Sequence, residues 1–169
     1  HRFGGEGDMQ GLAIGNLVLV GLWELMGDHV RALDWAGTLL GARGRVLPMA
    51  TEPLVIEADV TGLVEDPRMS RVIRGQVAVA TTPGVVRRVR LTPHAPVACP
   101  DAVAAIETAD VVTLGPGSWF SSVIPHVLVP EQLAALTRTR ARKILFVNLA
   151  AEPGETTGFS VERHLHVLS

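Results

Sequence analysis

The feature that most constrains this chain is a short apolar run that stops abruptly in a loop rich in glycine and hydroxyl groups, within residues 110–122. Val111, Val112 and Leu114 carry the apolar run, and the sequence Gly-Pro-Gly-Ser follows at once. A run of this length bounded by glycine and proline is typical of a buried strand that ends in a tight turn. The segment therefore predicts a strand over 111–114 with a loop at its carboxyl end.

The composition of this loop is that of an anion-binding turn. Gly115 and Gly117 lack a Cβ, so the backbone there can approach a ligand closely and take positive φ without strain. Pro116 stiffens the turn, and a helix that begins next would direct unpaired N–H groups toward a phosphate or pyrophosphate. Hydroxyl donors follow at Ser118, Ser121 and Ser122. An ordinary strand-to-helix turn with Ser118 as the N-cap explains the same residues, so other parts of the chain must decide.

Composition narrows the classes of protein to consider. With 169 residues and 47% hydrophobic content, the chain suits one domain with a substantial core. A net charge of -2 gives no general attraction to nucleic acid or to anionic lipid. The single cysteine, Cys99, allows no intrachain disulfide and fits a reducing cytoplasm. Polar residues interrupt the apolar segment 12–26, so we expect a cytoplasmic protein with no membrane insertion and no nucleic-acid partner.

The first half of the chain changes from helical to strand-like patterns. Apolar residues at three- and four-residue spacing predict two helices, over 8–26 and 28–40. Residues 45–91 then contain four β-branched runs, at 45–49, 54–60, 72–79 and 85–91. Alternation in the second and fourth runs is typical of strands with one solvated face. An antiparallel or mixed section is therefore predicted in the middle of the chain.

The second half alternates helices with short apolar strands. Helices are predicted over 101–108, 131–138 and 160–168, and strands over 111–114 and 144–148. This order is typical of a parallel sheet, in which ligands bind outside the carboxyl ends of the strands. The loops that begin after Leu114 and at Asn148 both fall at those ends. We therefore expect the two loops to meet and to form one cleft.

Other candidate residues leave alternatives open. Gly15 interrupts a helical pattern at a cost of about 1 kcal/mol relative to alanine, which close approach of a ligand or of another helix would explain equally. Asn16 beside it would need partners for its amide if it were buried. The six histidines have no convincing ligand spacing, so no metal site is predicted. Glu152 and Glu155 would serve either as caps of the next helix or as catalytic carboxylates.

Four separated motifs, at residues 11–17, 44–48, 109–125 and 148–156, together resemble the YvcK group of the CofD-like family. Their order and spacing match over essentially the whole chain, and Trp119-Phe120 with Pro125-His126 resembles the actinobacterial branch. The resemblance implies an α/β, Rossmann-like fold: a largely parallel sheet with helices on both faces and the ligand at the strand ends. It also implies that residues 1–169 form a single partial domain of a larger one, with an N-terminal glycine-rich segment and a C-terminal part lying outside it.

The resemblance carries two functional expectations. The YvcK branch is a gluconeogenesis and cell-morphology factor that binds UDP-sugars, notably UDP-N-acetylglucosamine. The CofD branch transfers a phospholactyl group from a nucleotide donor to a deazaflavin. We expect binding without turnover, with no catalytic residue, no metal and no required cofactor, and with homo-oligomerisation left open. The expected ligand-binding residues are Gly15, Asn16, Gly115, Pro116, Gly117, Ser118, Phe120, Ser121, Ser122 and Asn148.

Three departures from the family pattern qualify this expectation. Leu12 replaces the usual histidine of the Gly-Asn motif and removes a polar contact, and Phe120 replaces a residue that is often tyrosine. The family's Gly-Gly-Gly-x-Gly loop and Asp-Asp-Gly-Gly-Ser segment have no counterpart here. The metal-binding aspartates of a CofD-type transferase would lie in that part. The substitutions at Leu12 and Phe120 also fit a third hypothesis, a protein-interaction scaffold that no longer binds the ligand.

Overall fold

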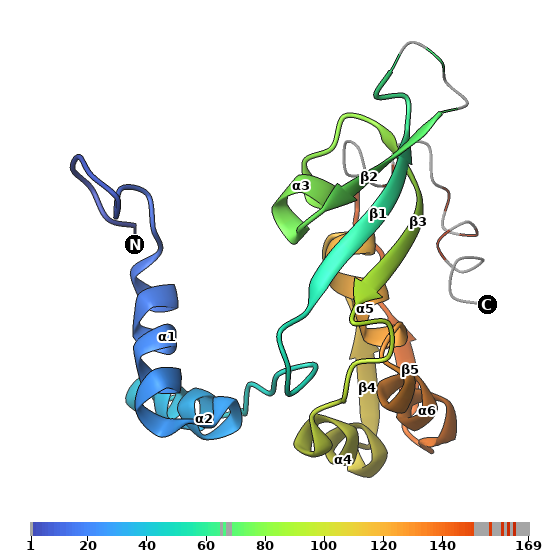
Figure 1. Cartoon of the computed structure of the whole chain (residues 1–169). Helices are drawn as coiled ribbons and strands as arrows, with labels where there is room; N and C mark the ends of the chain where they lie inside the picture. The colour runs from blue at the N-terminus through green and yellow to red at the C-terminus, as the bar shows by residue number, and fades with distance from the viewer. Residues whose placement is uncertain are drawn as a thin grey trace. The chain divides into compact units, whose positions relative to one another are not determined.

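The structure is a computed structural model that describes residues 2–64, 66, 69–150, 156, 160, 162 and 164. The chain forms two compact units, residues 1–48 and 49–169 (Figure 1). The expectation that residues 1–169 form one partial domain stays a prediction.

The first unit is a helical hairpin of α1 (Ile14–Met26) and α2 (His29–Leu39). Gly27 ends α1 in the left-handed conformation, with its N–H donating to the carbonyl oxygen of Trp23. Asp28 caps α2, because its carboxylate accepts the backbone N–H of Arg31 at 3.0 Å. Both predicted helices are confirmed, although α1 begins six residues later than the predicted residue 8, since Gly11 at φ +78° belongs to the preceding turns.

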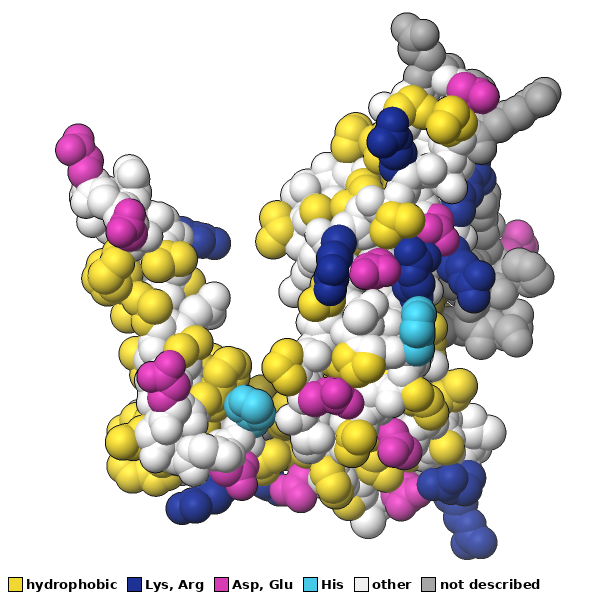
Figure 2. Space-filling view, in the orientation of Figure 1, with side chains coloured by type: hydrophobic (Ala, Val, Ile, Leu, Met, Phe, Trp, Pro, Cys, Tyr) yellow, Lys and Arg dark blue, Asp and Glu magenta, His cyan; other side chains and the backbone are white. Residues whose placement is uncertain are grey.

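The largest sheet of the second unit is antiparallel, with β1 (Val55–Thr61) between β2 (Ser70–Arg74) and β3 (Val85–Thr92). Alternate residues of β1 are buried, and they pack with Val86, Val89 and Leu91 of β3 in the hydrophobic core. This confirms the predicted antiparallel section. The opposite face is charged: Arg90 bridges Glu57 at 3.0 Å and Asp59 at 2.9 Å, and acidic and basic side chains intermix over this face in Figure 2.

Three predicted strand boundaries are wrong. The run 72–79 is not one strand, because Gly75 at φ +101° ends β2 and the chain continues as α3 (Gln76–Ala80) with Val79 fully buried. The run 45–49 forms no strand among the described residues. Pro48 has no N–H to donate, and the isolated bridge between Ala50 and Ala98 lies just after the run. The last strand spans residues 142–145 instead of 144–148.

The remaining elements place the glycine loop. A parallel pair is formed by β4 (Val111–Leu114) and β5 (Arg142–Leu145), as predicted for the second half of the chain. Helices α4 (Pro100–Thr108) and α6 (Pro130–Arg138) pack against each other. Between β4 and α6 the chain forms a five-residue π-helix, η1 (Trp119–Val123), and then α5 (Ile124–Val127).

The core joins these elements to the antiparallel sheet. Trp119, Phe120 and Val123 of η1 are buried in one cluster with the apolar residues of β1 and β3. The α/β class is therefore confirmed. Of the predicted helix 160–168, only Ser160, Glu162 and His164 are described, so that prediction lies largely outside the described residues. In the described part of the chain, no helix has both the length and the apolar character that crossing a bilayer requires.

Candidate functional site

The carboxyl ends of β4 and β5 lie side by side. Their parallel register pairs Leu114 with Leu145, and the backbone N–H of Phe146 donates to the carbonyl oxygen of Leu114 at 2.8 Å. The segments that follow the two strands therefore leave the sheet at the same edge. This is the arrangement in which α/β proteins bind ligands.

Gly115 lets the first loop turn against the end of β5. Its φ is +73°, a conformation that residues with a side chain rarely adopt. A Cβ at this position would lie 2.5 Å from the carbonyl oxygen of Phe146, which is too close for any non-glycine residue without movement of the backbone. The peptide bond between Gly115 and Pro116 is cis, and the Pro116 side chain is exposed.

Asn148 joins the two loops through a pair of hydrogen bonds to one residue. The N–H of Gly117 donates to Oδ1 of Asn148 at 3.0 Å, and Nδ2 of Asn148 donates to the carbonyl oxygen of Gly117 at 3.1 Å. The expectation that the two loops meet is therefore confirmed. The Gly117 N–H, expected to face a ligand, is already taken by Asn148.

The serines of the loop lie in different environments. Ser118 is half-buried, and its carbonyl oxygen accepts the backbone N–H groups of Ser122 at 2.8 Å and Val123 at 3.1 Å, which starts η1. Ser122 is exposed, and a Cβ on Gly117 would lie 3.7 Å from its Cβ, so the two residues are neighbours on the loop. Phe120 is only 5% exposed and packs in the core, so its ring is part of the hydrophobic cluster.

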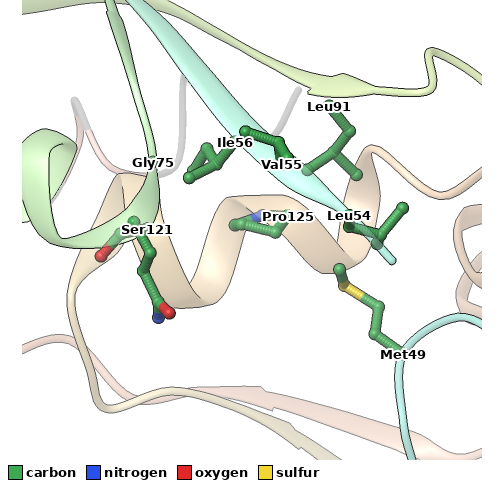
Figure 3. A pocket seen from close by; sticks show the side chains of 9 residues that line it. Met49, Leu54, Val55, Ile56, Gly75, Leu91, Ser121 and Pro125 are labelled. Carbon is green, nitrogen blue, oxygen red and sulfur yellow. The ribbon is translucent and has the colours of Figure 1, made fainter. Parts of the chain in front are cut away.

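Ser121 lines a separate cavity of about 290 Å³ between η1, α5 and the antiparallel sheet (Figure 3). Ser121 is 7% exposed, and no hydrogen bond of its hydroxyl is found among the described residues. The rest of the lining is mostly apolar: Met49, Leu54, Val55, Ile56, Gly75, Gln76, Leu91 and Pro125. The structure thus places the hydroxyls of Ser121 and Ser122 in different surroundings, although the residues are adjacent in sequence.

Gly15 and Asn16 belong to the first unit. Both are exposed in the first turn of α1, where the N–H of Asn16 donates to the carbonyl oxygen of Ala13 at 3.1 Å. Leu12, at the position of the family's histidine, is 43% exposed. Within the second unit, the structure brings the loop residues and Asn148 together.

Sequence reasoning missed two neighbours of the loop. The carbonyl group of Phe146 limits position 115 to glycine, and a backbone group carries no signal in the sequence. Trp119 is 2% exposed and packs edge-to-face on the imidazole of His164, with ring centroids 4.7 Å apart. Its indole Nε1 has no hydrogen-bond partner in the part of the chain that the structure describes.

Among the described residues, no cluster of three or more histidine, cysteine, aspartate or glutamate side chains could hold a metal ion. Glu152 and Glu155, the two carboxylates of the second loop, lie outside the described residues. Cys99 is fully buried with a free thiol. The chemistry that the described loop offers is therefore that of backbone and hydroxyl groups.

The fold and the site define an α/β protein with a glycine loop at the ends of two parallel strands. The family model described as 2-phospho-L-lactate transferase CofD matches residues 1–169. A Mycobacterium tuberculosis protein named "Putative gluconeogenesis factor" is 66% identical over all of this chain and 49% of its own length. The Bacillus subtilis "Gluconeogenesis factor" is 31% identical over all of this chain and 51% of its own length.

The chain belongs to the CofD-like family, and within it to the YvcK group, whose curated members carry the name gluconeogenesis factor. A Bacillus halodurans crystal structure, described as a member of the upf0052 family, matches with a TM-score of 0.87 and 32% identity. That match covers 99% of this chain and 52% of the other. The chain thus spans about half the length of the relatives it matches.

Proposed function

We propose that the full-length protein is a cytoplasmic regulator that binds a nucleotide-activated sugar of the UDP-N-acetylglucosamine class and acts on cell-envelope and gluconeogenic carbon metabolism. Turnover is not part of this proposal. The observation that carries it is the junction of the two loops, in which Asn148 holds Gly117 at 3.0 and 3.1 Å. This junction gives the carboxyl ends of β4 and β5 a defined surface, where ligands of α/β proteins bind.

The chemistry of the first loop supports an anionic, polar ligand. No acidic residue occurs between positions 111 and 122, so no carboxylate of that segment repels a pyrophosphate. Exposed Ser122 and half-buried Ser118 carry hydroxyl groups beside the glycine turn. Hydroxyl and backbone N–H groups donate hydrogen bonds to phosphate oxygens. In the proposed complex the loop holds the pyrophosphate or the sugar.

The names of the relatives support a regulator, but a fold alone does not define an activity. Calorimetry on the full-length protein with UDP-N-acetylglucosamine tests the proposal directly. We expect saturable heat, and a ligand at 100 times its Kd should stabilise the folded state by about 2.7 kcal/mol. No heat from a folded sample up to about 1 mM ligand would contradict the proposal, since that concentration corresponds to a binding free energy of only about -4 kcal/mol.

A matched pair of variants locates the ligand. Ser122→Ala removes the exposed hydroxyl beside Gly117 and should raise Kd by about threefold to tenfold, the effect of one lost hydrogen bond. Ser70→Ala removes an equally exposed hydroxyl on β2 and should leave Kd unchanged. Equal Kd values for the two variants would argue that the ligand does not touch the Ser122 hydroxyl.

A second candidate function is the phospholactyl transfer named by the matching family model. In that reaction the hydroxyl of a deazaflavin replaces the nucleotide on the phospholactyl phosphorus. Incubation of the full-length protein with deazaflavin alcohol, nucleotide donor and magnesium separates the two candidates. A mass increase on the acceptor favours the transferase, whereas binding of the UDP-sugar without such a product favours the regulator.

A further inference from the structure

Asn148 was expected to contact the ligand, but both atoms of its amide are already engaged with the protein. Its Oδ1 accepts from the Gly117 N–H at 3.0 Å, and its Nδ2 donates to the Gly117 carbonyl oxygen at 3.1 Å. Both hydrogen bonds are partly buried. We infer that Asn148 is a positioning residue, which holds the Gly117 turn in the shape that the ligand requires and acts on the ligand through that turn. The inference rests on the proposed function.

The loop needs such a constraint because its own backbone is permissive. Gly115 has a φ of +73° and Gly117 a φ of +156°, so two of three consecutive residues occupy conformations open mainly to glycine. Glycine loses more conformational freedom on ordering than any other residue. If the loop became ordered only on binding, the free-energy cost of ordering it would weaken the affinity for the ligand. A loop that is ordered before binding avoids this cost.

The geometry of an asparagine amide suits this role. A primary amide holds an acceptor oxygen and a donor NH2 group in one plane, so one edge of it can pair with the N–H and C=O of a single residue. The 31-residue separation between Gly117 and Asn148 means that these bonds tie the loop after β4 to the loop after β5. Gly115, which turns against the Phe146 carbonyl oxygen, restrains the start of the same loop. Together these contacts restrain the turn at both of its glycines.

Two variants of Asn148 separate the two hydrogen bonds. Asn148→Ala removes both. Asn148→Asp keeps the acceptor for the Gly117 N–H but sets a second acceptor against the Gly117 carbonyl oxygen. Gln76→Ala is the matched control, because it removes an exposed side-chain amide that has no hydrogen bond among the described residues.

Amide hydrogen exchange in the ligand-free, full-length protein tests whether Asn148 holds the Gly117 turn. We expect the Gly117 N–H to exchange about tenfold faster in Asn148→Ala than in the wild type, which corresponds to one lost hydrogen bond. Asn148→Asp should retain part of the protection, and Gln76→Ala all of it. Unchanged exchange of the β1 amides shows that each variant is folded. The Kd for UDP-N-acetylglucosamine should rise by about tenfold in Asn148→Ala.

Two results would refute the positioning role of Asn148, and a third would refute only the proposed function. A weaker Kd with unchanged Gly117 exchange would make Asn148 a direct ligand contact and refute the positioning role. Faster Gly117 exchange with an unchanged Kd would refute it as well, because the turn would then not matter for binding. If the wild type binds no UDP-sugar, the proposed function fails, and ligand-free exchange at Gly117 still decides whether Asn148 holds the turn.

Discussion

Replacing Gly115 by alanine tests the close approach on which the loop depends. Its φ of +73° costs an alanine about 1–2 kcal/mol on steric grounds. The added Cβ would also lie 2.5 Å from the Phe146 carbonyl oxygen, a backbone atom that cannot swing aside as a side chain does. Forcing extra volume into a packed site costs about 1–3 kcal/mol. We therefore expect a loss of about 2–5 kcal/mol in the free energy of unfolding, from the sum of these two effects.

Gly62 provides the matched control for this prediction. Its φ of +80° is nearly the same, but no atom of the described residues lies within 4 Å of the position that a Cβ would take. Gly62→Ala therefore carries the conformational cost alone, about 1–2 kcal/mol. Alanine also lowers the entropy of the unfolded chain at both sites, so this contribution cancels in the comparison.

Urea denaturation of the full-length protein measures both variants under one set of conditions. The difference between Gly115→Ala and Gly62→Ala isolates the contact with Phe146 and should be about 1–3 kcal/mol. Losses that agree within about 0.5 kcal/mol, the size of ordinary surface effects, would refute the close approach of the loop to β5.

Two further predictions concern the scaffold. Val60 is fully buried in β1, and Val60→Ala removes two methyl groups and leaves a cavity. This variant should lower the free energy of unfolding, measured by urea denaturation, by about 2 kcal/mol. The control Val72→Ala, at a position 60% exposed on β2, should change the free energy of unfolding by less than about 0.5 kcal/mol. The hydrogen bond from Arg45 lowers the pKa of Asp34, so this ion pair contributes stability above the unfolded pKa of the carboxyl and loses it as pH falls through the lower folded pKa. A carboxyl-carbon NMR titration should therefore show Asp34 titrating below its ordinary range and rising toward it in Arg45→Gln; an unshifted midpoint in the wild type would refute the pairing.

Local signals in the sequence determined most of the elements around the site. Helical spacing located α1 and α2, and alternation located β1 and β3, because apolar residues recur with a different period in helices and in strands. The glycines and proline after Leu114 marked the end of β4, since few other residues tolerate the turn. The same kind of signal failed at Gly75, where a β-branched run on both sides suggested one strand but a positive φ divides it into β2 and α3.

Only the tertiary structure decided how the site residues are used. The sequence placed Asn148 and the glycine loop at strand ends, but the parallel register of β4 and β5 sets the Asn148 amide against Gly117. Packing of η1 on the antiparallel sheet buries Phe120 and directs Ser121 to the cavity, while Ser122 stays exposed. A local pattern records the preferences of single residues for conformation and burial. Contacts between residues far apart depend on how whole elements pack, and no single segment of sequence encodes that packing.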